Sequence, residues 1–172
     1  MGFKTTYDIT THARGEGYMV VNTKFFGEVD IDDAKVLDFP HGIIGFEDYR
    51  KFAIIYDVDD EGESKISWLQ SLEESTLALP VVDPLAIVKE YSPMIEDELL
   101  KPLGNPADED LLCLLVMTVP SDMTKVTANM KAPVIINSKT NKGVQLIVDN
   151  ADYPVKFNVY ESVQKMKKEA GE

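Results

Sequence analysis

Three side chains in this 172-residue sequence are histidine or cysteine: His12, His41 and Cys113. A zinc or iron site needs several such ligands together. His12 lies in a polar N-terminal stretch that we expect outside the fold, and Cys113 sits inside the apolar run LLCLLVM, which is typical of a buried, inert thiol. A Cys–His dyad of Cys113 and His41 has no supporting motif. We therefore expect no metal and no cofactor.

The acidic segment DVDDEG resembles the start of a calcium-binding loop. Asp57, Asp59, Glu61 and Gly62 match loop positions one, three, five and six. Position twelve of such a loop must be a bidentate glutamate, and here it is Trp68. The segment is better interpreted as an acidic turn between two strands.

The segment DFPHGIIGFEDY, residues 38–49, holds Gly42 and Gly45 but does not form the G-x-G-x-x-G pattern that opens a phosphate-binding helix. The sequence also lacks G-x-S-x-G and H-E-x-x-H. We expect both glycines to be structural, supplying a positive φ or a close backbone approach. An enzyme is not favoured; the alternative that remains is a small β-barrel enzyme or ligand-binding protein with a pocket near His41.

The net charge of −13, from 17 basic and 30 acidic residues, argues against direct binding of nucleic acid or of an anionic membrane. Between residues 57 and 110 there are 15 acidic residues and 3 basic ones. This segment is either a solubilising face or an electrostatic patch for a basic partner. The expected patch consists of Asp57, Asp59, Asp60, Glu61, Glu63, Glu96, Asp97 and Glu98.

Short β-prone runs separated by turns dominate the rest of the chain. A Gly27-centred turn predicts a hairpin over 19–31, and further strands are expected at 35–39, 51–58, 65–72, 76–84, 111–120, 131–137, 143–150 and 154–161. The continuous apolar run at 111–120 predicts a central strand buried on both faces. One short helix is expected near residue 106. The pattern indicates an all-β fold: a small antiparallel β-barrel-like single domain with at most one or two short helices.

The chain organisation follows from these runs. We expect an N-terminal extension over 1–18, the β-barrel-like domain over 19–161 and a charged C-terminal tail over 162–172. No apolar run reaches the roughly 18 residues of a membrane span. The single cysteine and the absence of an apolar N-terminal segment favour a cytoplasmic protein, and nothing resembles a dimer seam, so a monomer is expected.

Two apolar clusters are candidate partner contacts because they combine apolar side chains with a charged or polar surround. The first contains Tyr91, Met94 and Ile95, and the second contains Pro120 and Met123. The glycine turn adds a third candidate, formed by Ile43, Ile44 and Phe46. Asn129 and Pro133 are expected to shape a turn, since an asparagine in a turn bonds its own backbone.

Three stretches in order, FPHGIIGFEDYRKFAI, WLQSLEESTLALPVVDP and TANMKAPVIINSKTNKGVQLIVDNADYPVKF, resemble the FliW family of bacterial flagellar assembly factors. The sequence departs from that family at Ile44, where G-I-P-G-F has proline, and its first eighteen residues match nothing in the family. The resemblance implies a mostly antiparallel β-barrel-like fold, no catalysis and two protein partners, flagellin and the RNA-binding repressor CsrA. An acidic protein beside the basic surface of CsrA would repel RNA and speed encounter.

Overall fold

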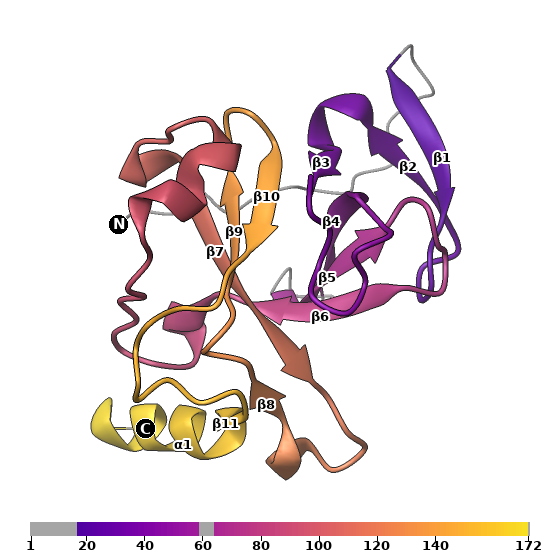
Figure 1. Ribbon diagram of the computed structural model, residues 1–172. Coiled ribbons are helices and arrows are strands. Elements are labelled where there is room, and N and C mark those ends of the chain that lie inside the picture. The colour runs from indigo at the N-terminus through magenta and orange to yellow at the C-terminus, as the bar shows by residue number, and fades with distance from the viewer. Residues whose placement is uncertain (1–16, 59–63, 172) are drawn as a thin grey trace.

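The fold is a hydrogen-bonded ring of strands with a separate hairpin on one side and a helix at the C-terminal end (Figure 1). The computed structural model describes residues 17–58 and 64–171. The hairpin comprises β1 (Tyr18–Asn22) and β2 (Glu28–Asp32). The other strands are β3 (Leu37–Asp38), β4 (Lys51–Val58), β5 (Ser64–Ser71), β6 (Ala78–Val82), β7 (Leu111–Thr118), β8 (Thr127–Ala128), β9 (Val134–Asn137), β10 (Lys142–Gln145) and β11 (Phe157–Asn158).

Helical structure is confined to one α-helix and several short 3₁₀ segments within the described residues. The α-helix is α1 (Val159–Glu169). The 3₁₀ segments are η1 (Asp33–Lys35), η2 (Pro84–Ala86), η3 (Asp97–Leu103), η4 (Asp108–Asp110) and η5 (Met123–Lys125). None of the helices in this part of the chain is long and apolar enough to cross a membrane.

The ring closes because β7 pairs with strands on both of its sides. The order runs β7, β6, β5, β4, β3, β10 and β9, and β9 pairs back onto β7. All of these pairings are antiparallel except β3 with β10, where Lys142 lies opposite Asp38 in a parallel pair. Closure removes exposed edges along the ring. The predicted all-β, barrel-like fold is thereby confirmed.

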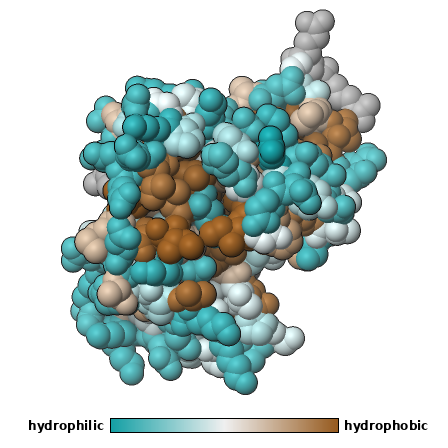
Figure 2. Space-filling model, in the orientation of Figure 1, coloured by the Kyte–Doolittle hydropathy of each residue, from teal (hydrophilic) through white to brown (hydrophobic). Residues whose placement is uncertain are grey.

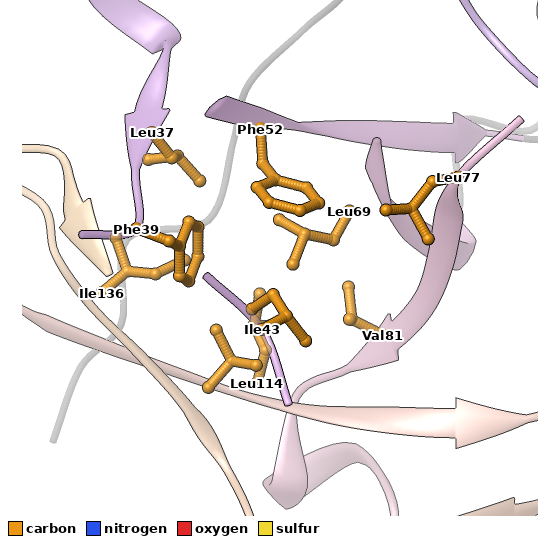
Figure 3. Close-up of a cluster of buried hydrophobic side chains, with 10 residues drawn as sticks. Leu37, Phe39, Ile43, Phe52, Leu69, Leu77, Val81, Leu114 and Ile136 are labelled. Atoms are coloured by element: carbon orange, nitrogen blue, oxygen red, sulfur yellow. The ribbon is translucent and has the colours of Figure 1, made fainter. Parts of the chain in front are cut away.

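The largest core cluster gathers side chains from almost every strand of the ring (Figure 3). Phe39 and Phe52 are fully buried and meet edge to face, with ring centroids 5.3 Å apart. Gly143 on β10 makes room for Phe39, because a Cβ there would lie 2.4 Å from the aromatic ring. The members of the cluster are Leu37, Phe39, Ile43, Phe52, Leu69, Leu77, Val81, Leu114, Val134 and Ile136.

Strand β7 is buried on both faces, as its continuous apolar sequence predicted. Leu114 packs in the ring cluster, whereas Leu115 and Met117 pack in a second cluster with Val126 and Met130. Alternate residues of a strand point to opposite faces, so one strand serves two cores.

The C-terminal segment differs from the prediction of a strand over 154–161. Strand β11 has only two residues, and α1 begins at Val159. The side-chain oxygen of Asn158 accepts the backbone N–H of Glu161 at 2.9 Å, which caps the first turn of the helix. Lys167 and Lys168 lie in the last turn, where positive charge complements the helix dipole.

Some predictions fall outside the described residues. These are most of the N-terminal extension, residues 1–16, and the acidic residues Asp59, Asp60, Glu61 and Glu63. Strand β1 starts at Tyr18, so the hairpin begins one residue earlier than expected.

Candidate partner-binding surfaces

The glycine turn joins β3 to β4 through two consecutive tight bends. The backbone N–H of Gly42 donates to the carbonyl of Phe39 at 2.9 Å, and that of Phe46 donates to Ile43 at 2.7 Å. Both glycines have positive φ, 66° at Gly42 and 89° at Gly45. A Cβ at Gly42 would lie 2.6 Å from the backbone of Glu47, whereas one at Gly45 would meet nothing within 4 Å. The tighter bend therefore has no room for a side chain.

This geometry sends the two isoleucines of the turn in opposite directions. Ile43 is 2 % exposed and belongs to the ring core, so the prediction that it faces a partner is wrong. Ile44 is 50 % exposed and Phe46 is 38 % exposed. The backbone N–H of Ile44 donates to Oε1 of Gln145 on β10 at 2.9 Å, which ties the turn to that strand.

The exposed side of the turn borders a hollow of about 240 Å³. Ile44, Phe46 and Val155 line it, together with polar side chains that include Gln145. Ile147 lies two residues beyond Gln145 and is 65 % exposed, on the same side of an extended segment whose intervening Leu146 is buried. Figure 2 shows apolar side chains gathered on one face of the molecule. We name Ile44, Phe46, Ile147 and Val155 the front apolar surface.

Asn129 lies in the five-residue loop between β8 and β9 and lines the hollow. Its Oδ1 accepts the backbone N–H groups of Lys131 at 3.0 Å and Ala132 at 3.1 Å. Pro133 is fully buried at the end of this loop, and its carbonyl accepts the N–H of Leu146. Both residues therefore occupy structural positions in the turn that the sequence indicated.

A second hollow, of about 300 Å³, lies between α1 and the strands beneath it. Met123 is 56 % exposed and lines it, with Met117 and Val126 deeper inside and Tyr160 and Val163 on the helix side. Pro120 is half-buried and does not line this hollow. The binding role predicted for this loop stays a prediction, with Met123 as its accessible residue.

The Tyr91–Ile95 cluster is less exposed than the sequence suggested. The Tyr91 hydroxyl donates to the carbonyl of Met130 at 2.8 Å, and its ring stacks on Tyr153 with centroids 4.9 Å apart. Burial raises the pKa of Tyr91 well above its usual range. Ile95 is half-buried against an interior cluster. Of the three residues, Met94 alone is exposed, at 55 %; the free apolar contact expected of Tyr91 and Ile95 is corrected to packing within the fold.

The acidic triplet Glu96, Asp97 and Glu98 is exposed around the start of η3. Glu98 forms an exposed ion pair with Lys101 at 3.3 Å, and pairs of this kind contribute little stability. Asp57 lies near the end of β4, just before the undescribed acidic residues. The triplet is thus the part of the predicted patch whose exposure is known.

Among the residues that the structure describes, the groups that could do chemistry are not brought together. His41 is exposed and does not line the hollow beside its own turn. Burial, with a further effect of Asp83, raises the pKa of the Cys113 thiol to about 12, which keeps it protonated and unreactive at neutral pH. Within residues 17–58 and 64–171, no three His, Cys, Asp or Glu side chains are placed to hold a metal ion.

Comparison with known proteins identifies the family. The model of the FliW protein family matches residues 20–159. The flagellar assembly factor FliW of Lachnoclostridium phytofermentans is 50 % identical over 155 residues, covering 90 % of this chain and 99 % of that protein. The flagellar assembly factor FliW of Thermotoga neapolitana is 41 % identical over 150 residues, covering 87 % and 98 %.

A solved structure shares the fold as well. The crystal structure of a flagellar assembly factor FliW superposes with a TM-score of 0.74 at 25 % identity, covering 83 % of this chain and 97 % of that one. The family model, matched over residues 20–159, spans the ring of strands and all but the first two residues of the β1–β2 hairpin. The chain therefore belongs to the FliW family of non-enzymatic flagellar assembly factors.

Proposed function

We propose that this protein binds flagellin and, when flagellin has left it, binds and antagonises the translational repressor CsrA. Export of flagellin would then free the protein to relieve repression, so that flagellin synthesis follows export. In this proposal the protein acts in the cytoplasm as a monomer and touches no nucleic acid itself. Membership of the flagellar assembly factor family supports the assembly role, and the sequence resemblance supports the choice of partners.

The proposed binding of flagellin rests on one observation, the front apolar surface. Flagellin ends in helical segments that aggregate outside the filament, and an amphipathic helix buries its apolar face in an apolar groove. Ile44 and Val155 line the hollow and are 50 % and 59 % exposed, and Ile147, two residues beyond the lining residue Gln145, is 65 % exposed. Exposed apolar side chains that gather in one place mark an interaction site more often than isolated ones do.

The negative charge of the chain supports the proposed binding of CsrA. A protein that holds RNA must present basic surface, and this chain carries a net charge of −13. The exposed triplet Glu96–Glu98 adds local negative potential that favours encounter with such a surface. An acidic protein bound nearby would also repel RNA without filling the RNA site.

The flagellin half is tested by calorimetric titration of purified flagellin into the wild-type chain, Ile44→Ser and Ile147→Ser. Truncation of a central apolar contact commonly costs more than about 1 kcal/mol, so each variant should bind roughly tenfold more weakly. Leu85→Ser is the matched control, since Leu85 is 44 % exposed on η2 and lines neither hollow. Equal affinities for all four proteins would refute the assignment.

The CsrA half is tested by measuring association rates at low and high salt for the wild type and for Glu96→Lys with Glu98→Lys. Electrostatic steering predicts slower association for the reversed charges and a strong salt dependence for the wild type. Rates that respond to neither change would contradict steering by this triplet.

A further inference from the structure

Strand β1 has an outer edge whose backbone groups have no partner among the described residues. The N–H of Asp33 donates to the carbonyl of Gly17, and that of Thr23 donates to Gly27. In an antiparallel pair, hydrogen-bonded and non-bonded positions alternate, so the register of β1 with β2 places residues 18, 20 and 22 at non-bonded positions. Their N–H and C=O groups therefore point away from β2, and β1 lies at the rim of the molecule (Figure 1).

Within the part of the chain that the structure describes, this edge lacks the features that usually protect an edge strand. Natural edges carry lysine, proline, a bulge or a covering segment. The sequence of β1 is YMVVN, with no charged residue and no proline, and its register with β2 is unbroken. Tyr18 is 42 % exposed and Val20 is 55 % exposed. An edge of this kind is suited to pairing with another strand.

The same face of the hairpin is acidic. Val20 lies opposite Asp30, and Asn22 lies opposite Glu28, so these side chains share one face. Glu28 and Asp30 are exposed, and neither makes an ion pair with another described residue. A strand added beside β1 would therefore meet apolar side chains with carboxylates behind them.

We propose that the outer edge of β1 binds an extended segment of a basic protein, which adds to the hairpin as a third strand. The identity of that protein rests on the proposed function: it is CsrA, because an RNA-binding protein supplies the complementary positive charge. A second copy of this chain is a poorer occupant, since two chains of net charge −13 repel each other. Helical segments of flagellin offer no free backbone groups to a strand edge.

The test uses Val20→Pro in the full chain. The N–H of residue 20 points outward, so proline removes a donor and blocks the edge while leaving the bonds between β1 and β2 in place. The control Val20→Thr keeps the N–H group and the preference for strand. With purified CsrA at low salt, Val20→Pro should bind at least about tenfold more weakly than the control. Its urea midpoint should stay near that of the control.

Hydrogen exchange gives a second readout that does not depend on the proline variant. In the free chain, the amides of Tyr18, Val20 and Asn22 should exchange rapidly, and saturating CsrA should protect them. Protection in the free chain would overturn the proposal, because residues 1–16 or a second copy would then already occupy the edge. Unchanged CsrA affinity in Val20→Pro would overturn it as well.

These outcomes are separable from failure of the proposed function. If the wild-type chain binds no CsrA at all, the proposed partner is wrong. If the wild type binds CsrA and exchange at Tyr18, Val20 and Asn22 does not change, the partner stands and the site on β1 is wrong.

Discussion

Replacing Gly42 with alanine is expected to destabilise the fold much more than replacing Gly45, although both glycines lie in the same turn with positive φ. A left-handed conformation costs a residue with a Cβ about 1–2 kcal/mol. Alanine also stiffens the unfolded chain, which offsets about 0.4–1 kcal/mol of that cost. These two effects are similar at both positions, so Gly45→Ala should lower the free energy of unfolding by about 1 kcal/mol or less.

Gly42 carries an additional steric cost. Its alanine Cβ would lie 2.6 Å from Cα and 2.7 Å from the carbonyl oxygen of Glu47, both backbone atoms, so the turn itself must shift. Overpacking of this kind typically costs about 1–3 kcal/mol. The difference between the two variants isolates the clash, and Gly42→Ala should lose about 2–4 kcal/mol in all.

Urea unfolding followed by tryptophan fluorescence measures the difference, since Trp68 on β5 is the single tryptophan and contacts Phe25 of the hairpin loop. With a urea slope of roughly 2 kcal/mol per molar, the two midpoints should differ by about 0.5–1.5 M. Equal midpoints with equal slopes would refute the reasoning, because they would mean that the turn relaxes around a Cβ at no cost.

Three further predictions concern the polar side chains of Gln70, Asn129 and Cys113. Gln70→Leu should lower the free energy of unfolding by about 2–3 kcal/mol, because the side-chain amide of Gln70 accepts the N–H of Lys24 and donates to three backbone carbonyls. A smaller urea-midpoint shift than in Gly45→Ala would contradict this. Asn129→Ala should lower the free energy of unfolding by about 1–2 kcal/mol, because it leaves two N–H groups without an acceptor. Asn129→Asp keeps the acceptor and should destabilise the fold less. The pKa of Cys113 rises from 9.0 to about 12 on folding, so the stability from its protonated form is complete below pH 9 and lost as pH rises toward 12. Cys113→Ala should lack that loss when urea midpoints are compared across this range.

Much of the ring could be predicted because its strands carry their own local signals. The hairpin was marked by Gly27 between two β-prone runs, β4 by its flanking turns, and β7 by an apolar run too continuous for a half-exposed strand. Pro80 lies where β6 pairs with β5 but not yet with β7, so it occupies a position that is locally an edge of the sheet. The start of α1 was missed because it depends on one capping side chain, Asn158, in a sequence that also suits a strand.

The binding surface was harder to predict, since exposure in turns depends on tertiary packing. Nothing local distinguishes Ile43 from Ile44, and the closure of the Gly42 bend decides which one is buried. Tyr91 and Ile95 look free in an acidic segment, but Tyr153, far away in sequence, stacks on Tyr91. Ile147 was missed although a signal existed: the alternation around it buries Leu146 and Val148 and turns Ile147 outward.

The way the β1–β2 hairpin is attached bears on what it can bind. Apolar contacts of Val21 and Ile31 with Ala53 hold it against the ring, and such contacts alone are not directional. The side chain of Gln70, 1 % exposed, adds direction because its Oε1 accepts the N–H of Lys24 at 3.1 Å while its amide nitrogen donates to carbonyls at the end of β5 and in the β5–β6 connection. A hairpin fixed in this way presents the edge of β1 already ordered, so a strand that adds to it loses freedom only on the partner's side. Loss of the amide in Gln70→Leu should therefore weaken strand addition at β1 even where the ring itself stays folded.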